Sequence, residues 1–512
     1  MNPKITRRST LTRIVTTMLV ASALSTTAAY AASFQYRHPV VGLVSSPTAQ
    51  AQQVVTEILM ALTGGPALPA GEVNWPYSYD LKQLLSVTGD PAYNSSRVSW
   101  ELTSGALPAG LSLGNDGVVS GTPTAKNTTG SSFQIRATYK TKEGQQAYTI
   151  VVNGTVLHVT QIASGYYHSC AVTTAGGLKC WGRNTSGQLG DNSTLQRLSP
   201  VDVVGLTSGV ALVAAENTNT CAVTTAGSVK CWGDNAFGQL GNNSITASRV
   251  PVDVTGLSTG VVSLAVGYRH ACALTGAGDA KCWGDNSAGQ LGNNSSTSSS
   301  VPVDVYGLAA SVATVVAGGN HTCAVTKAGG AKCWGYGTYS MLGDGTSNSR
   351  YAPVDVVGLS SGVAQLLATS SNTCALTTAG GVKCWGFNGQ GQVGDGTTTQ
   401  RSTPVDVTGL TAGVTKLALG SGASHHCAIT DVGGLKCWGA NTNGALGDSS
   451  TTNRLVPVDV AGLAVGVTSV SLGYRHTCAV ASGAAKCWGA NSYGQVGDKS
   501  TTQRLTPVEV TP

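Results

Sequence analysis

Fourteen cysteines are the side chains of this sequence with the widest chemistry, and all of them fall into seven close pairs. Two cysteines on neighbouring strands can form a disulfide, and as thiolates they can bind a zinc ion. If Cys170 lies opposite Cys180 in a hairpin, the two Cα atoms are about 4.5–5.5 Å apart, which is within the range of a disulfide. The seven pairs are Cys170–Cys180, Cys221–Cys231, Cys272–Cys282, Cys323–Cys333, Cys374–Cys384, Cys427–Cys437 and Cys478–Cys487.

A histidine lies two residues before the first cysteine in five of the seven pairs, so a His-Cys-Cys zinc site has to be considered. In the other two pairs this place is taken by Asn219 and Asn372, which leaves the ligand set incomplete. We therefore expect disulfides, no metal ion and no cofactor, with the histidines bonded to strand backbone near an axis. The five histidines are His168, His270, His321, His425 and His476.

The cysteine pairs belong to a unit that recurs seven times, with 51 residues between successive first cysteines except for one interval of 53. Each unit holds four short segments that are typical of strands: a V-x-x-L-like run, H-[ST]-C-A-V-T, [LVA]-K-C-W-G and P-V-D-V. One such sheet cannot bury both of its faces, whereas seven around a common axis can. The sequence therefore predicts an all-β fold in which residues 156–512 form a seven-bladed β-propeller of four-stranded antiparallel blades, with the terminal strands pairing to close the ring. A linear solenoid is the alternative.

The pattern H-[ST]-x-A-[VL]…C-W-G-x-N-x-x-G-Q-L-G resembles the regulator of chromosome condensation repeat, whose members form seven-bladed propellers. Its G-Q-L-G element is complete at Gly187–Gly190, Gly238–Gly241 and Gly289–Gly292 and is varied in the other four units. The resemblance implies the propeller fold. It leaves the function open, because one fold can carry many functions.

Charged residues also recur at fixed places in the unit. A lysine precedes every second cysteine and an acid stands in every P-V-[DE]-V segment, as do Lys179 and Asp202 in the first unit. Five units carry an aspartate six residues before an arginine, as in Asp191 and Arg197. We expect cross-strand and loop-stapling ion pairs, each worth at most about 1 kcal/mol at the surface. A charged channel and a calcium site are the functional alternatives.

Residues 1–31 have the features of a signal peptide: basic residues, an apolar stretch at 14–24 and a small-x-small cleavage site at 29–31. The apolar stretch is shorter than the roughly 20 residues that a membrane span needs. Removing residues 1–31 takes away four of the 30 basic residues and leaves 26 against 24 acidic ones, a charge of +2. This gives no electrostatic basis for binding nucleic acid. We expect a secreted or extracytoplasmic protein, in a periplasm or at a cell surface, with no membrane span after signal cleavage.

Residues 70–155 carry Leu107–Leu113 (LPAGLSL) and Gly117–Pro123 (GVVSGTP), and they resemble an immunoglobulin-like domain found in many bacterial surface and secreted proteins. Alternating segments such as Phe133–Tyr139 fit the strands of a small β-sandwich. The resemblance implies a spacer or adhesive module, and we expect a stalk. We expect residues 32–69 to be a linker in which apolar residues such as Val54, Leu59 and Leu62 form a short helix before a Gly-Gly break.

Aromatic residues that depart from the repeat are the candidates for binding. The first and third connections of an antiparallel blade emerge on one face of a propeller, and the third is long here. If the ring closes, the first and last units become neighbours and bring their tyrosines together. Tyrosine and arginine on a rigid rim are enriched at protein interfaces. The candidate partner-binding residues are Tyr166, Tyr167, Tyr268, Arg269, Tyr474, Arg475, Tyr493, Tyr336, Tyr339 and Phe387.

No sequence motif of a hydrolase, zinc protease, phosphate-binding loop or EF-hand occurs, so we expect no enzyme and no catalytic residues. The expected function is that of an exported, monomeric binding module whose loops on one face grip a protein. A carbohydrate-binding surface protein, which would take a glycan as its partner, and a propeller enzyme are the alternatives. The family's nuclear member acts on a small GTPase as a guanine nucleotide exchange factor, and export argues against that role here.

Overall fold

The computed structural model describes residues 57–418, 420 and 422–512, so the expected signal peptide lies outside the described residues. Apart from three short 3-10 helices, the regular elements of this part are β-strands. No helix in the described residues is long and apolar enough to cross a membrane. The 3-10 helices are η1 (Leu81–Leu84), η2 (Ser95–Arg97) and η3 (Thr338–Ser340). The predicted all-β fold is confirmed.

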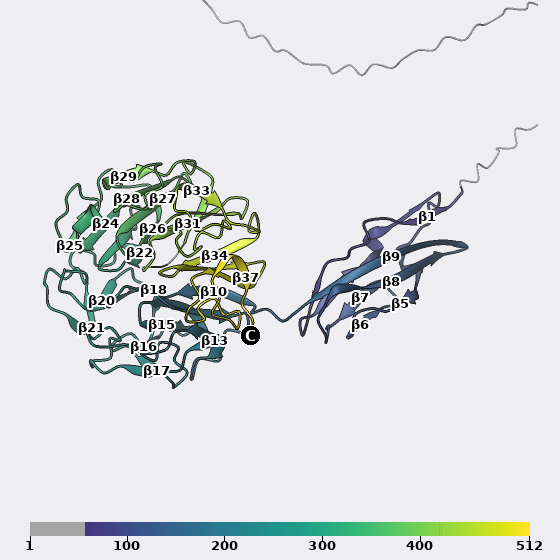
Figure 1. Ribbon diagram of the computed structural model, residues 1–512, viewed down its shortest axis with the longest axis horizontal. Helices are drawn as coiled ribbons and strands as arrows, with labels where there is room; N and C mark the ends of the chain where they lie inside the picture. Colours follow the sequence, from purple (N-terminus) through teal and green to yellow (C-terminus); the bar gives the residue numbers. More distant parts are fainter. Residues whose placement is uncertain (1–56, 419, 421) are drawn as a thin grey trace, which may run out of the picture. The chain divides into compact units, whose positions relative to one another are not determined.

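Seven four-stranded sheets follow one another along the sequence and stand around a common centre, as Figure 1 shows. Each sheet is formed by consecutive antiparallel strands, in the order β10-β11-β12-β13 for the first blade and β34-β35-β36-β37 for the last. This confirms the seven-bladed propeller and excludes the linear solenoid.

The first strand of each blade faces the axis, and the second is buried along almost its whole length. The first strands are β10 (Val159–Ser164), β14 (Val210–Glu216), β18 (Val261–Val266), β22 (Val312–Ala317), β26 (Val363–Ala368), β30 (Val414–Leu417) and β34 (Val467–Leu472). The second strands are β11 (His168–Thr173), β15 (Asn219–Thr224), β19 (His270–Thr275), β23 (His321–Thr326), β27 (Asn372–Thr377), β31 (His425–Thr430) and β35 (His476–Ala481).

The third and fourth strands complete each blade toward the outside of the ring, and the fourth is only partly buried. The third strands are β12 (Leu178–Gly182), β16 (Val229–Gly233), β20 (Ala280–Gly284), β24 (Ala331–Gly335), β28 (Val382–Gly386), β32 (Leu435–Gly439) and β36 (Ala484–Gly489). The fourth strands are β13 (Arg197–Asp202), β17 (Ser248–Asp253), β21 (Ser299–Asp304), β25 (Arg350–Asp355), β29 (Arg401–Asp406), β33 (Arg454–Asp459) and β37 (Arg504–Glu509).

A disulfide joins the second and third strands of every blade. Cys170 and Cys180 are direct partners in the register of β11 and β12, and their Cα atoms are 4.0 Å apart. In the last blade the two cysteines are only nine residues apart, and the hairpin turns at Ser482 and Gly483, both with positive φ. Such a two-residue turn matches the twist of the strands, so the cysteines still oppose each other. All fourteen cysteines are paired in this way.

The ring closes between the last blade and the segment that leads into the first. The two ends of the propeller pair as expected, but through the segment before β10, since β10 and β37 themselves belong to different blades. The backbone N–H of Leu157 donates to the carbonyl of Val510 (3.2 Å), and its carbonyl accepts from the N–H of Ala485 (2.9 Å). Closure therefore uses a single extended segment and leaves all seven blades contiguous in sequence.

Tryptophans lock each blade to the one before it. The indole of Trp232 is fully buried, and its N–H donates to the carbonyl of Gln188 in the preceding blade at 2.9 Å. Gly190 has a φ of +70°, and a Cβ there would lie 2.7 Å from the indole nitrogen of Trp232. The glycine that ends G-Q-L-G is thus required twice, by its backbone conformation and by the close approach of the next blade's ring.

The N-terminal part of the described residues is a small β-sandwich. Its sheets have the orders β2-β9-β8-β5 and β3-β7-β6, with an additional pair β1-β4. Alternate residues of β8 and β9, such as Ile135 and Ile150, fill the core, which gives this region its predicted sandwich character. The strands are β1 (Leu59–Leu62), β2 (Gly71–Glu72), β3 (Tyr77–Asp80), β4 (Leu85–Thr88), β5 (Ser99–Gly105), β6 (Leu111–Leu113), β7 (Val118–Gly121), β8 (Asn127–Tyr139) and β9 (Lys142–Asn153).

The short helix expected before the Gly-Gly break is wrong at Leu59 and Leu62, while Val54 lies outside the described residues. Leu59–Leu62 is strand β1, which pairs antiparallel with β4, and Leu62 stands opposite Leu85. Pairing with β4 satisfies the backbone groups that a helix would satisfy internally, and it places Leu62 in the sandwich core. The sandwich therefore takes in residues before position 70.

Candidate functional site

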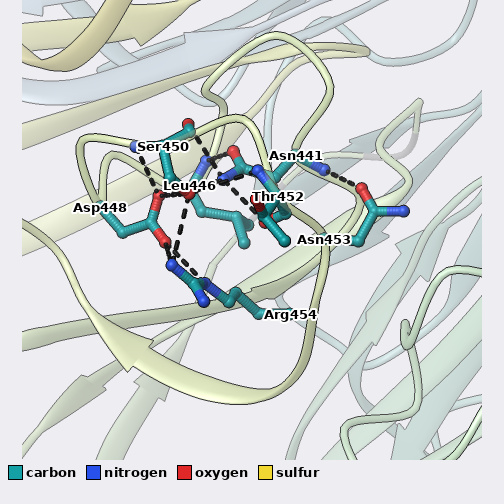
Figure 2. A network of polar contacts seen from close by, with 7 residues as sticks. All are labelled: Asn441, Leu446, Asp448, Ser450, Thr452, Asn453 and Arg454. Atoms are coloured by element: carbon teal, nitrogen blue, oxygen red, sulfur yellow. Dashed lines mark hydrogen bonds and ion pairs between the residues drawn. The ribbon is translucent and has the colours of Figure 1, made fainter.

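A buried asparagine organises the long third connection of the blade, which Figure 2 shows for blade six. The side-chain oxygen of Asn441 accepts the N–H of Leu446 at 3.0 Å, and its amide donates to the carbonyl of Thr452 at 3.1 Å. The same amide donates to Asp448 at 3.0 Å, and Asp448 pairs with Arg454 at 2.7 Å. These bonds fix both ends of the loop. Equivalent asparagines are Asn184, Asn235, Asn286, Asn388 and Asn491.

The recurring charges form the predicted ion pairs. Burial alone raises the pKa of Asp448, but hydrogen bonds from Ser450 and Arg454 outweigh it and hold the pKa below its usual value. The cross-strand pair of Lys179 and Asp202 spans 2.7 Å at the surface. The loop pairs are Asp191–Arg197, Asp344–Arg350, Asp395–Arg401, Asp448–Arg454 and Asp498–Arg504. Both sets are architectural, because each aspartate named here is already bound to its own lysine or arginine.

The histidines connect neighbouring blades, and the expected bond to strand backbone is wrong. Nε2 of His168 lies 2.8 Å from the hydroxyl of Thr220 in the next blade. That hydroxyl donates its proton to the carbonyl of Gln188 (2.9 Å), so it must accept from an Nε2–H. Burial lowers the pKa of His168 to about 3, which keeps the ring neutral. The other bonds of this kind are His270–Thr322, His321–Thr373, His425–Thr477 and His476–Ser169.

No group of three or more histidine, cysteine, aspartate or glutamate side chains in the described residues is arranged to hold a metal ion. A cavity of about 240 Å³ lies at the axis, lined by the first strands of the blades. Its lining is mainly apolar, with side chains such as Ile162, Leu264 and Val315.

Five tyrosines gather on the looped face where the first and last blades meet, and we call them the tyrosine cluster. The rings of Tyr166 and Tyr474 stack at 4.0 Å between centroids and 11° between planes. Tyr167 lies 4.9 Å from Tyr493 and 4.8 Å from Tyr166, and Tyr268 of the third blade reaches Tyr166 at 6.5 Å. The predicted meeting of tyrosines from the first and last blades is therefore confirmed. Tyr268 adds a ring from the third blade to this group.

Arginines lie over the rings of the tyrosine cluster. The guanidinium of Arg475 is 4.7 Å from the ring centroid of Tyr474. Arg269 is 5.2 Å from Tyr268. Arg183, which sequence reasoning missed, is 5.3 Å from Tyr493. The sequence could have indicated Arg183, because it directly follows a Cys-Trp-Gly segment and so begins a third connection on the same face.

The remaining candidates form a separate aromatic pair in blades four and five. The ring centroids of Tyr339 in blade four and Phe387 in blade five are 5.1 Å apart. Tyr336 lies in the same third connection as Tyr339. This loop departs from the others because Gly337 replaces the organising asparagine. Tyr339 and Ser340 then adopt positive φ angles of 62° and 60°. In the part of the sequence that the structure describes, no ring contact joins this pair to the tyrosine cluster.

The fold and site together define a disulfide-bonded seven-bladed propeller that presents arginine-capped tyrosines on its looped face. Two family models, both described as "Regulator of chromosome condensation (RCC1) repeat", match the propeller, and one described as "Putative Ig domain" matches residues 45–153. The matched ranges are 159–188, 210–239, 261–290, 312–340, 363–392 and 467–495 for one repeat model and 176–223, 226–274, 278–325, 379–429 and 433–480 for the other. The chain belongs to the RCC1-repeat family.

Curated relatives share the repeat region. The ultraviolet-B receptor UVR8 of Arabidopsis thaliana is 30% identical over 325 residues, which cover 62% of this chain and 74% of the receptor. The E3 ubiquitin-protein ligase HERC2 of Homo sapiens is 31% identical over 333 residues, which cover 63% of this chain but only 7% of the ligase. The similarity to the ligase is thus confined to a small part of that protein.

Solved structures agree on the fold. Prp20p of Saccharomyces cerevisiae has a TM-score of 0.59 at 20% identity and covers 70% of this chain and 88% of its own. Human WBSCR16 has a TM-score of 0.56 at 24% identity and covers 67% of this chain and 91% of its own. At these identities the likeness supports the propeller fold alone.

Proposed function

We propose that this protein is an exported binding module that grips a protein partner with its tyrosine cluster, uses the immunoglobulin-like domain as a stalk and catalyses no reaction. The observation that carries the proposal is the stack of Tyr166 on Tyr474 across the junction of the first and last blades. A stack shared by two blades holds both rings in place before a partner arrives. Rigid aromatic side chains offer a large contact area at a low cost in conformational entropy.

The chemistry of the cluster suits a protein surface. Burial raises the pKa of Tyr166 and of Tyr167, so both hydroxyls stay neutral and act as hydrogen-bond donors at ordinary pH. Arg183, Arg269 and Arg475 add positive charge around the rings. Neutral tyrosines surrounded by arginines are the composition that protein interfaces enrich.

Relatives support a role in protein binding. The structure of Prp20p is described together with its binding properties to Gsp1p and histones, and another structure has yeast RCC1 (Prp20) bound to Kap60. The absence of catalysis is proposed because the recurring reactive side chains of the propeller are already engaged in structural bonds. The cysteines form disulfides, and the repeated histidines are buried, neutral and bonded to hydroxyls of the next blade.

Export is supported by the disulfides, since seven of them form and persist in an oxidising compartment. The source organism should release a protein whose first residue is Ala32, as N-terminal sequencing of the mature protein would show. Thiol titration of the folded, unreduced protein should find almost no free thiol. A full-length protein retained in the cytoplasm with reduced cysteines would contradict export.

Capture of a partner from surface extract of the source organism tests the binding face. Tyr166→Ala should lower recovery of the captured protein at least tenfold, since removal of a central interface tyrosine commonly has this effect. Tyr306→Ala is the matched control, because Tyr306 is 62% exposed and follows the fourth strand of its blade, on the opposite face. Equal recovery by both variants would remove the tyrosine cluster from the binding site, and capture of a glycan in place of a protein would replace the proposed partner class.

A further inference from the structure

A polar pocket of about 110 Å³ opens beside the tyrosine cluster and is lined mainly by blades six and seven, with Gln390 from blade five. Blade six contributes Ser424 from its first connection and Asn443 and Ala445 from its third. Blade seven contributes Tyr474 and Arg475 from its first connection. The pocket thus shares Tyr474 with the tyrosine cluster, and Arg475, which lies over that ring, lines the pocket as well.

The pocket exists because blade six lacks a side chain that most other blades have. Ala445 stands where five blades carry a buried glutamine, in a G-A-L-G variant of the G-Q-L-G element. In blade five the side-chain oxygen of Gln392 accepts the N–H of Gln390 at 2.8 Å and so fills the space under its loop. Ser424 is also small where blades three and seven carry Arg269 and Arg475. The glutamines that Ala445 replaces are Gln188, Gln239, Gln290, Gln392 and Gln495.

The lining of the pocket carries one positive charge and no carboxylate. Arg475 donates to the hydroxyl of Tyr474 at 3.2 Å and to the side-chain oxygen of Asn443 at 3.4 Å. These two hydrogen bonds hold its guanidinium at the rim of the pocket. Among the described residues Arg475 forms no ion pair. Ser424 adds a hydroxyl donor, whereas the hydroxyl of Thr442 donates to the side-chain oxygen of Asn443 at 3.4 Å. Burial lowers the pKa of His425 to about 4, so this ring is neutral.

The third connection that forms one wall is held in place before any ligand binds. Asn441, next to Thr442, bonds to backbone on both sides of the loop, as Figure 2 shows. A polar cavity with fixed donors and one unpaired guanidinium favours a small group that carries negative charge and accepts several hydrogen bonds. A carboxylate has this chemistry, and its two oxygens match the fork of an arginine.

We propose that this pocket binds a carboxylate of the protein partner, with Arg475 as its cation, Ser424 as a hydroxyl donor, and Asn443 and Thr442 as polar neighbours that position the guanidinium. The inference rests on the proposed function for the partner, while the pocket itself is a property of this protein. The carboxylate can come from an aspartate or glutamate side chain or from the C-terminus of a polypeptide, and the two sources are distinguished by experiment.

The test uses the oxidised mature protein and three tripeptide probes at millimolar concentration, with binding followed by ligand-observed NMR. Ac-Ala-Asp-Ala-NH2 presents a side-chain carboxylate, Ac-Ala-Ala-Ala-OH a terminal one, and Ac-Ala-Asn-Ala-NH2 neither. We expect at least one acidic probe to bind at least tenfold more tightly than the asparagine probe, because hydrogen bonds to a charged group are stronger than neutral ones. Equal signals from all three probes, or no binding by any, would overturn the inference.

Two variants locate the binding. Ala445→Gln installs the residue that five other blades accommodate and fills the pocket, and Arg475→Gln removes the charge with little change in size. Each should lower the affinity for the acidic probe at least tenfold, while Tyr306→Ala leaves it unchanged. The circular dichroism spectrum checks that each variant is folded. Undiminished binding by Ala445→Gln and Arg475→Gln would place the carboxylate elsewhere and end the proposal.

The outcomes separate this inference from the proposed function. Tyr493 belongs to the tyrosine cluster but neither lines the pocket nor stacks on Tyr474. Tyr493→Ala should therefore weaken capture of the protein partner but not binding of the acidic tripeptide. If wild type and Ala445→Gln capture the partner equally well, the inference fails and the proposed function stands. If no partner is captured but the acidic probe binds and is lost in Ala445→Gln, the pocket stands and the proposed function fails.

Discussion

The propeller and the sandwich of this protein are both all-β, yet they gain stability in different ways. Every blade of the propeller is joined by a disulfide and by a buried tryptophan that bonds to the blade before it. The sandwich has no cysteine and relies on an apolar core that includes Trp100, Ile135 and Ile150. The comparison indicates that a blade of about 50 residues, too small for a core of its own, needs covalent and inter-blade bonds that the sandwich does not.

Reduction of the disulfides should change the stability of the propeller relative to that of the sandwich more than any other treatment. Each disulfide closes a loop of about 10 residues, which contributes about 2–3 kcal/mol in the chain-entropy model. Loss of seven such bonds should unfold the propeller at moderate temperature and leave the sandwich transition unchanged. Differential scanning calorimetry with and without reductant measures both transitions. Tryptophan fluorescence reports mainly the propeller, since seven of the nine tryptophans lie in its blades.

A reduced propeller that melts at the same temperature as the oxidised one would show that the blades are stable without their disulfides. A sandwich that loses its transition on reduction would show that the two regions are not independent. Either result would show that the propeller and the sandwich do not differ in their dependence on disulfides.

Acid should have the next largest effect, and again on the propeller. Burial lowers the pKa of His321 to about 3 and that of His270 to about 4, against about 6.5 in an unfolded chain. A depressed histidine pKa means that the unfolded state binds more protons between these values. Stability is therefore full above about pH 6.5 and is lost as the pH falls toward 4, by about 1.4 kcal/mol per histidine and pH unit. The buried histidines among the described residues all belong to the propeller.

His321→Asn tests the acid window with a residue that the repeat itself uses, because Asn372 occupies this place in blade five. The melting temperature of the propeller should fall less steeply with pH in the variant than in wild type, by the contribution of one proton. The sandwich transition serves as the internal control. Identical slopes for wild type and variant would mean that His321 does not titrate in this window.

The structure of a single blade could be predicted from the sequence more fully than the contacts between blades or the effect of residues that differ from the repeat. Spacing placed Cys170 opposite Cys180 correctly, because the hairpin register follows from a short turn between fixed strands. It did not find the hydroxyl partner of His168, since Thr220 lies 52 residues away and meets the histidine only when neighbouring blades pack. The recurring H-[ST]-C pattern could have indicated these partners. Each hydroxyl that bonds a histidine comes from the residue that follows the histidine position in the next blade.

The site shows the same limit. Closure of the ring was enough to bring Tyr166 to Tyr474, since adjacency of the first and last blades is a matter of topology. The change from Gln to Ala445 was visible in the sequence, but a missing side chain becomes a pocket only when the surrounding side chains are in place. At Leu59–Leu62 a short apolar run fitted helix and strand equally well, and pairing with β4 decided between them.

A loop staple should show a smaller effect. Asp448→Asn breaks the pair with Arg454 and leaves a guanidinium beside a neutral amide, at a cost of about 1–2 kcal/mol. The third blade natively has Asn293 and Ser299 at these two places. The double variant Asp448→Asn with Arg454→Ser should therefore cost no more than the single variant, as a double-mutant cycle by urea unfolding would measure. Additive losses would mean that the two residues act independently.

The cross-strand lysines should have the smallest effect, although they recur in every blade. Lys230→Gln breaks a pair with Asp253, whose side chain is 76% exposed, so the loss should be below about 1 kcal/mol and vanish at high salt. Lys486→Gln breaks the pair with Glu509, whose side chain is 43% exposed and lies in the strand that ends the ring. Less exposed charges are screened less, so this second variant should lower the melting temperature more than the first. Equal shifts for the two variants would show that the closing blade is no different from the rest, and that the difference in exposure between Asp253 and Glu509 does not set the value of these pairs.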